Sequence, residues 1–311
     1  MTSVSTAAFY SSAIYNMNQL QQQTQDLQTQ ISTGNKLTHS YDDPLAAAQM
    51  RSLQAADSLT TADTSVSNAA KTSLNLTDTA LTQLSNIVTE VKTLATQAAN
   101  STLTDTQRAA IGTQVSQYYS QLVSLANSQD ANGKALFGGN GSGSAAYTTD
   151  ATGKLTYVGT ASAASVSLGA GLSVTTGVTG PDVLDYSSGG SQQNLLDVVK
   201  TLGDTLSAST SSTASNTAAT TAANTALTTL ADGLNAITTQ QTVVGARLSW
   251  IATTSSVQTA ITQQRATSES DVGGTDITTA VSKLQQTMTV LEAAQASFTK
   301  VSSLSLFSLL Q

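Results

Sequence analysis

Apolar and small residues recur at alternating spacings of three and four near both ends of the chain. This period of 3.5 residues is typical of a coiled-coil seam rather than of the broader stripe on a globular helix. A helix of this length is marginal alone in water, so each seam needs a partner, and the simplest partner is the other end of the same chain. The N-terminal seam is Tyr10, Ala13, Met17, Leu20, Thr24, Leu27 and Ile31. The C-terminal seam is Ile277, Val281, Leu284, Met288, Leu291, Gln295 and Phe298, with Leu304, Phe307 and Leu310 beyond it.

A longer helix is predicted after the N-terminal seam. Gly34 is expected to end the first helix, because glycine tolerates the left-handed geometry found there. Asp42, Asp43 and Pro44 predict the next helix start, with carboxylates near the positive end of the helix dipole and proline at the first helical position. Residues 44–99 contain no further proline and no glycine. They predict one helix of roughly 80 Å.

Further helices are predicted on both sides of a glycine-rich region. Thr104 to Gln107 has the pattern of a capping box, so a second helix should form a hairpin with the first. Helical periodicity resumes at Gln192, weakens in the Ser/Thr stretch 207–221, and continues from about Ala222 to Thr267. The loop 269–276, with its two glycines, is then expected to mirror the loop 34–43.

Residues 127–190 differ in character from the rest of the chain. They hold most of its glycines, the β-rich pieces Leu155–Val158 and Val166–Leu168, and a turn at Asp150–Gly153. The whole pattern therefore predicts a mainly α fold with an inserted small β domain. The expected domains are a terminal coiled-coil domain (1–43 with 269–311), a helical-rod domain (44–137 with 191–268) and an outer β domain (138–190).

The composition excludes several classes of function. Of the 311 residues 10% are charged, against about 25% in typical soluble domains. The net charge is −7 and the 12 Lys and Arg are scattered, which argues against nucleic acid and against an anionic membrane surface. No run approaches the ~18 apolar residues of a membrane span, and the N-terminus does not resemble a cleaved signal peptide. We therefore expect neither nucleic-acid binding nor membrane insertion.

No set of residues predicts catalysis, a cofactor or a metal. His39 is the only histidine, so a His-based triad or multi-His metal site is not possible within one chain. Asp42 and Asp43 could pair as carboxylates, but a helix start explains them sufficiently. The run Gly138–Gly143 lacks the Lys-Ser/Thr of a phosphate loop and is interpreted as a flexible turn. Asp130–Gly133 begins like a calcium loop, but its glycine comes too early, which favours a simple turn.

Two terminal motifs resemble those of the flagellin superfamily. Gln30-Ile-Ser-Thr-Gly34 followed by Ser40-Tyr-Asp-Asp-Pro44-Leu-Ala-Ala-Ala-Gln49 is similar to its N-terminal signature, and Phe298–Leu310 resembles its other end. Asn132–Gly139 is more similar to the turn of the hook–filament junction branch than to flagellin. The residues that carry this last likeness are Phe137, Gly138 and Gly139.

The resemblance implies a structural axial subunit at the junction between flagellar hook and filament. Its copies would form a ring through the two seams, with Gly34, Asp42, Asp43 and Pro44 as motif and hinge, and would contact hook-side and filament-side axial proteins. It also implies an extracellular, secreted protein, exported without a cleaved signal peptide and held beforehand by a cytoplasmic export chaperone. We expect the chain ends to order as they pack on neighbouring subunits.

Three alternatives remain open. Flagellin itself belongs to the same class, and a long filament of the purified chain would favour it. The β insert, rich in Ser, Thr and Gly, could instead be a carbohydrate-binding adhesin module on a helical stalk. An enzyme is disfavoured, because no base, nucleophile and orienting group can be named together.

Overall fold

The computed structural model describes residues 2–141, 143–150, 154–208 and 212–307, and it divides into two compact units. The first unit is Met1–Leu59 with Ala260–Gln311, and the second is Thr60–Thr259. The helices α2 (Pro44–Ala98) and α6 (Thr213–Gly273) contribute residues to both. The predicted fold class, mainly α with a small inserted β part, is confirmed. The division into three domains remains a prediction.

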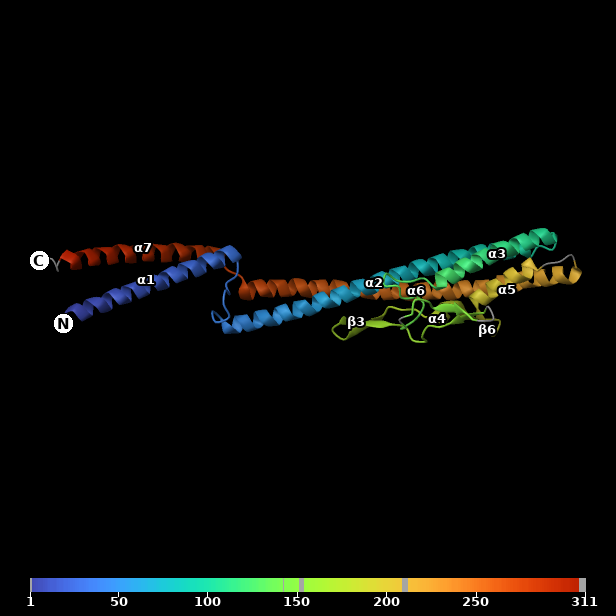
Figure 1. Cartoon of the computed structure of the whole chain (residues 1–311), viewed down its shortest axis with the longest axis horizontal. Helices are drawn as coiled ribbons and strands as arrows, with labels where there is room; N and C mark the ends of the chain where they lie inside the picture. Colours follow the sequence, from blue (N-terminus) through green and yellow to red (C-terminus); the bar gives the residue numbers. More distant parts are fainter. Residues whose placement is uncertain (1, 142, 151–153, 209–211, 308–311) are drawn as a thin grey trace. The chain divides into compact units, whose positions relative to one another are not determined.

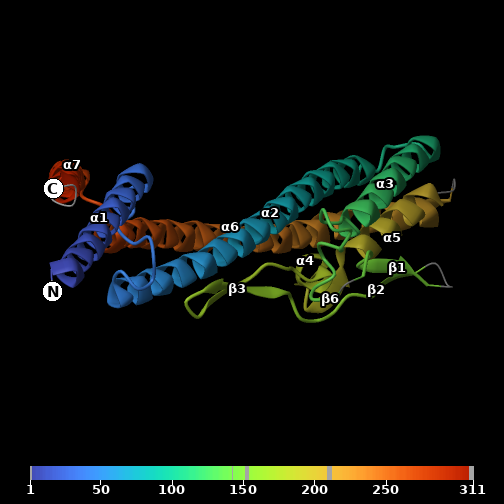
Figure 2. The same cartoon turned by 60° about the vertical axis from the view of Figure 1, so that its left-hand side comes forward.

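In the first unit, the two ends of the chain pair with each other. Helix α1 (Thr2–Thr33) lies beside α7 (Ile277–Phe307), and both termini are at the same end of this pair (Figure 1, Figure 2). The predicted pairing of the terminal helices is thereby confirmed.

The connection between α6 and α7 is shorter than predicted. Helix α6 continues to Gly273, so Glu269 is helical and the predicted loop 269–276 is wrong. The Gly274 N–H still bonds the Ser270 carbonyl at 2.8 Å, in the helical pattern. Glycine suits position 273 in this helix, because a Cβ there would meet the end of the Met50 side chain. The glycine marks close packing rather than a loop.

In the second unit, four helices enclose the main hydrophobic core. They are α2, α3 (Asp105–Ala126), α5 (Leu195–Ser207) and α6, and Thr104 begins α3 with the predicted capping box. Helices α3 and α5 approach closely because Gly112 faces α5, where an added Cβ would lie 2.6 Å from the Ser207 nitrogen. The core includes Leu74, Leu81, Leu84, Val88, Val115, Leu122, Leu196, Leu202, Leu230, Ile237 and Val244.

Two predicted helix starts in the C-terminal half are wrong. Helix α5 begins at Leu195 rather than at Gln192, because the Asn194 side chain accepts hydrogen bonds from the first backbone N–H groups of the helix. Gln192 lies in a strand instead. Helix α6 begins at Thr213 and includes most of the Ser/Thr stretch. Its small buried side chains, Ala219 and Ala223 among them, give this polar segment a face that packs.

The β part consists of antiparallel two-stranded ladders with one short helix, α4 (Gly180–Leu184) (Figure 1). The predicted β-rich pieces are confirmed as strands, and the predicted turn 150–153 falls mostly outside the described residues. The ladders are β1 (Tyr147–Thr149) with β2 (Leu155–Tyr157), β3 (Ser165–Gly169) with β4 (Leu172–Thr175), and β5 (Asp185–Ser188) with β6 (Ser191–Asn194).

Polar side chains tie the β part to the helices of the second unit. The Asn127 Oδ1, at the end of α3, accepts the Tyr147 N–H at 2.8 Å. From α6, the Gln258 Nε2 donates to the Leu168 carbonyl at 2.6 Å. Because buried backbone groups need partners, these bonds fix the insert on the helices.

Candidate functional site

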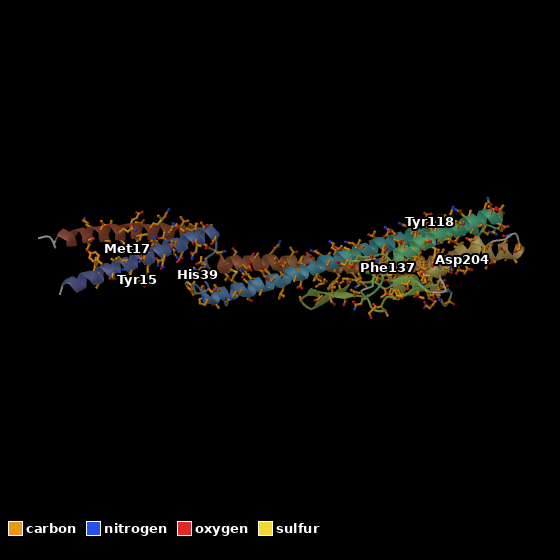
Figure 3. All side chains as sticks on the ribbon, in the orientation of Figure 1. Tyr15, Met17, His39, Tyr118, Phe137 and Asp204 are labelled. Atoms are coloured by element: carbon orange, nitrogen blue, oxygen red, sulfur yellow. The ribbon has the colours of Figure 1, made fainter. Side chains whose placement is uncertain are left out.

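The N-terminal seam lies on the face of α1 that packs against α7. All seven seam residues are partly buried. Every other described side chain of α1 is exposed, except that of Gln30. Near the outer end of the pair, the Tyr10 and Phe298 rings meet edge to face with centroids 5.4 Å apart. Met17 belongs to this seam and Tyr15 is exposed to solvent (Figure 3). The heptad pattern located this helix face correctly.

Only some residues of the predicted C-terminal seam lie on the packed face of α7. Leu284, Leu291 and Phe298 are partly buried, as predicted. The residues between them are not in the seam: Ile277, Val281 and Met288 are 54%, 36% and 42% exposed, and Gln295 is also exposed. In their place the pair buries Ala280, Thr287 and Ala294.

Small residues occupy these positions because they let the two helices approach each other. Choosing the largest apolar side chains therefore predicted the wrong positions for the packed face of α7. The part that Ile277, Val281 and Met288 play in assembly remains a prediction. The side chains of Leu304 and Phe307, and Leu310 altogether, lie outside the described residues.

The terminal pair buries its apolar residues only shallowly. No described side chain of α1 is fully buried, and on the described part of α7 only Ala280 is, at 5% exposed. Several large apolar side chains of the pair point to solvent instead, which is the property of a surface that packs on something else. They are Phe9, Ile14, Tyr15, Ile277, Val281, Met288, Val290 and Val301.

Backbone hydrogen bonds join the two chain segments that lead into this pair. Gly34 has a φ of +72°, the left-handed geometry expected at a helix end. Its carbonyl accepts the Thr275 N–H at 2.9 Å, and the Lys36 N–H donates to the Gly273 carbonyl at 2.7 Å. The segment after α1 and the segment before α7 are thus bonded side by side. The hinge role of Gly34 remains a prediction.

Asp42 and Asp43 have different structural roles. The Asp43 Oδ1 accepts the Ala46 N–H at 3.1 Å, so Asp43 caps α2 as predicted, directly before Pro44. Asp42 instead bonds the preceding loop, accepting the backbone N–H of His39 at 2.8 Å and that of Thr38 at 3.2 Å. These bonds, the one from His39 above all, hold the pKa of Asp42 below its ordinary value.

Asp276 is a capping residue that the sequence reasoning did not single out. Its Oδ1 accepts the backbone N–H groups of Thr278 and Thr279, and its Oδ2 accepts the Thr279 hydroxyl at 2.6 Å. The Thr279 hydroxyl and then the backbone N–H groups lower the pKa of Asp276. An Asp directly before a run of helical periodicity is a known start signal and could have revealed this cap.

The turn motif with Phe137, Gly138 and Gly139 is rigid rather than flexible. Phe137 is 1% exposed (Figure 3), and its carbonyl accepts the Gly180 N–H at 2.8 Å and the Tyr157 hydroxyl at 3.1 Å. Gly138 and Gly139 are buried, and a Cβ on Gly139, which has a φ of +68°, would lie 2.6 Å from the nearest carbonyl oxygen. For Gly138 and Gly139 the predicted flexible turn is therefore wrong, because these glycines pack closely against Ala135 and Thr160.

The described residues offer little for chemistry. They contain no group of three or more His, Cys, Asp or Glu side chains that could hold a metal ion. The Asp130 Oδ1 accepts the N–H groups of Asn132 and Lys134, so this segment is the simple turn that was expected. Across the described chain no helix is long and apolar enough to cross a membrane.

Comparisons with known proteins agree with this arrangement. Residues 4–142 match the family model described as the bacterial flagellin N-terminal helical region. Over 290 residues, 90% of each chain, the sequence is 25% identical to flagellar hook-associated protein 3 of Escherichia coli. Residues 4–142 of this chain therefore correspond to the N-terminal helical region of bacterial flagellin.

Two further proteins show the same likeness to flagellar proteins. Flagellar hook-associated protein 3 of Salmonella typhimurium is 30% identical over 44% of this chain and 43% of its own length. A solved flagellar hook-associated protein from Vibrio parahaemolyticus superposes with a TM-score of 0.68 at 21% identity, over 75% of this chain and all of that one. The structural likeness concerns the fold, and both sequence relatives are named flagellar hook-associated protein 3.

Proposed function

We propose that this chain is a structural axial subunit of the bacterial flagellum that forms the junction between hook and filament. The observation that carries the proposal is the similarity to flagellar hook-associated protein 3 of Escherichia coli over 90% of both chains. Such coverage leaves only a small part of either chain unmatched. It is not an enzyme in this proposal, because its role is to connect other axial proteins.

The terminal pair supplies the assembly surface in this proposal. Because α1 and α7 bury each other only shallowly, each copy keeps exposed apolar side chains that neighbouring copies can cover. Packing then stabilises the ordered pair by mass action, so ordering of the ends is coupled to assembly. Residues 1–43 with 269–311 form the inner layer, 44–137 with 191–268 the rod, and 138–190 the outer domain.

The partners follow from this position in the flagellum. Copies of the chain form a ring, with hook-side axial proteins on one rim and filament-side axial proteins on the other. The chain is exported to the outside of the cell without a cleaved signal peptide, and a cytoplasmic export chaperone holds its C-terminal region before export.

The test is complementation of a bacterium that lacks its own hook-associated protein 3. The chain has no cysteine, so a single Ser187→Cys variant, exposed on β5, can be labelled with a fluorescent maleimide. We expect motility to return and label to appear as one spot at the hook end of each filament. The control is the same variant lacking residues 277–311, which is added from outside as purified protein and should give no spot at hook ends, unlike the purified full-length variant.

Two results would reject the junction role. Label along the whole filament, or long filaments grown from the purified chain alone, would make the chain a flagellin. Secreted protein that never appears at hook ends would remove it from the flagellar axis altogether.

A further inference from the structure

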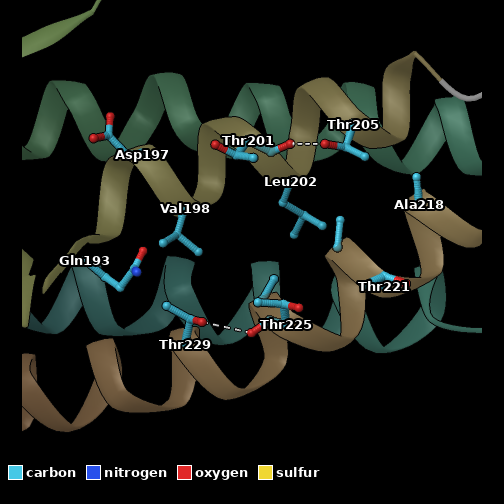
Figure 4. A pocket seen from close by; sticks show the side chains of 12 residues that line it. Gln193, Asp197, Val198, Thr201, Leu202, Thr205, Ala218, Thr221, Thr225 and Thr229 are labelled. Carbon is cyan, nitrogen blue, oxygen red and sulfur yellow. Dashed lines mark hydrogen bonds between the residues drawn. The ribbon is translucent and has the colours of Figure 1, made fainter. Parts of the chain in front are cut away.

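A groove of about 600 Å³ runs between α5 and α6 in the second unit (Figure 4). Its floor includes the buried Leu202 and Ala226. The walls are mostly threonine and alanine, from both helices. The remaining lining residues are Gln193, Asp197, Val198, Thr201, Thr205, Ala218, Thr221, Ala222, Thr225 and Thr229.

The groove is less polar than its threonines suggest. The Thr205 hydroxyl donates to the Thr201 carbonyl at 2.7 Å, and the Thr229 hydroxyl donates to the Thr225 carbonyl at 2.9 Å (Figure 4). Hydroxyls bonded to their own helix in this way require no partner from a guest. The α6 wall also carries no charged residue between positions 213 and 231. Asp197 on α5 is the charged residue of the lining, so it is the α6 side of the groove that suits an uncharged, apolar guest.

Another part of α6 exposes an uncharged surface of apolar and small residues. Apolar and small residues follow one another there at spacings of three and four, so they share one face of the helix. Trp250 and Val257 on this face are 45% and 54% exposed, and Val243 is partly buried. Within the span 243–257 the charged residue is Arg247, whose guanidinium is turned to the β part and donates to the Gly177 carbonyl at 2.9 Å. From 248 to 264 no charged residue occurs. This face, here called the Trp250 ridge, is Val243, Ala246, Trp250, Thr253 and Val257.

Trp250 is the strongest sign that the ridge docks. Tryptophan is enriched at the centres of protein interfaces and carries much of their binding energy, whereas charged residues are depleted there. An isolated exposed leucine needs no explanation, but a tryptophan and a valine two turns apart on an uncharged face do.

We infer that the groove of one copy receives the Trp250 ridge of a neighbouring copy. Thr225 and Trp250 are 25 positions apart on one continuous helix, which corresponds to about 40 Å. Ridge and groove are therefore different surfaces, and their contact is head-to-tail. Such a contact continues into a ring or a helical array rather than ending at a dimer. The inference rests on the proposed function, in which many copies lie side by side.

Fluorescence of the full-length chain tests the contact directly, because Trp250 is its only tryptophan. We expect the emission maximum to shift to shorter wavelength as the protein concentration rises, since docking removes the indole from water. Thr225→Lys places a charge in the groove and should abolish the shift. Thr228→Lys, equally exposed on α6 but outside the groove lining, should keep it. An emission maximum independent of concentration, or equal shifts in both variants, overturns the inference.

Cross-linking provides a second test, which measures whether two given positions on neighbouring copies lie close together. Thr225→Cys and Val257→Cys chains are mixed, or co-expressed in the complemented cells, and treated with a short bismaleimide. We expect dimers from this pair, none from Thr228→Cys with Ala252→Cys, and loss of the dimers when Trp250→Lys is added. Equal yields from both pairs contradict the inference.

The two proposals can fail separately. Motility of the complemented cells without the cross-link would leave the proposed function intact and reject the ridge-in-groove contact. A cross-link in the purified chain without complementation would support the ridge-in-groove contact and reject the proposed function.

Discussion

At the scale of single residues, two neighbouring tyrosines show how hydrogen bonding decides whether a buried hydroxyl stabilises the fold. The rings of Tyr147 and Tyr157 are 5.3 Å apart. The Tyr157 hydroxyl donates to the carbonyls of Phe137 at 3.1 Å and Thr160 at 2.9 Å. The Tyr147 hydroxyl is buried and has no hydrogen-bond partner among the described residues, and burial raises its pKa. A buried polar group without a partner costs free energy.

The two corresponding phenylalanine variants should therefore differ in sign. Tyr147→Phe removes an unbonded hydroxyl and should leave the free energy of unfolding unchanged or slightly higher. Tyr157→Phe removes bonds that hold the turn motif to the β part and should lower it by about 1 kcal/mol. Urea unfolding followed by circular dichroism measures both. A loss in Tyr147→Phe as large as that in Tyr157→Phe would mean that the hydroxyl of Tyr147 is bonded after all.

At the scale of secondary-structure elements, the terminal helix pair separates the observed seam from the predicted one. Leu291 lies in the observed seam, and Met288 lies outside it on an exposed face of α7. Leu291→Gln should destabilise the pair by about 1 kcal/mol, because a partly buried leucine loses part of its transfer free energy. Met288→Gln should leave the pair unchanged in the monomer. Helix content against temperature, measured at 222 nm, distinguishes them, and equal losses would support the predicted seam.

The capping carboxylates make the same region sensitive to acid. Asp42 and Asp276 both have a lowered pKa in the folded chain, because they accept hydrogen bonds there. A lowered folded pKa contributes stability above the unfolded value of 3.8, and that contribution is lost as the pH falls through the folded pKa. Asp276→Asn should flatten the pH dependence of α7 helix content below about pH 4 relative to the unchanged chain. Identical acid profiles would contradict this role.

Sequence periodicity predicted the existence of the elements well and their packing partners less well. Proline 44 and the capping box at Thr104 fixed two helix starts, because both signals act locally. The start of α6 and the phase of α7 were missed, because alanines such as Ala223 and Ala280 carry little periodic signal yet pack closely. Gly273 was wrongly predicted to lie in a loop for a similar reason. Its contact with Met50, which is distant in sequence, carries no periodic signal.

At the scale of the whole molecule, the two units differ in how deeply they bury apolar side chains. Leu81, Val88, Val115 and Leu122 of the second unit are completely buried. The described side chains of α1 include none that is fully buried, and those of α7 include only Ala280. Burial on this scale is what stabilises helices in proteins, since isolated helices are marginal. The first unit should therefore open locally while the second unit stays folded.

Hydrogen exchange on the full-length monomer tests this difference. Amide exchange tracks local opening, so backbone amides of α1 and α7 should exchange roughly 100-fold faster than those of Leu81–Val91 in α2. Upon assembly at hook ends the terminal amides should become protected, because neighbouring copies then cover the exposed apolar faces. The amides of α2 provide the internal control, since they should be protected in both states. Terminal helices as protected in the monomer as the α2 core would show that the pair needs no neighbours, and the coupling of order to assembly would then be wrong.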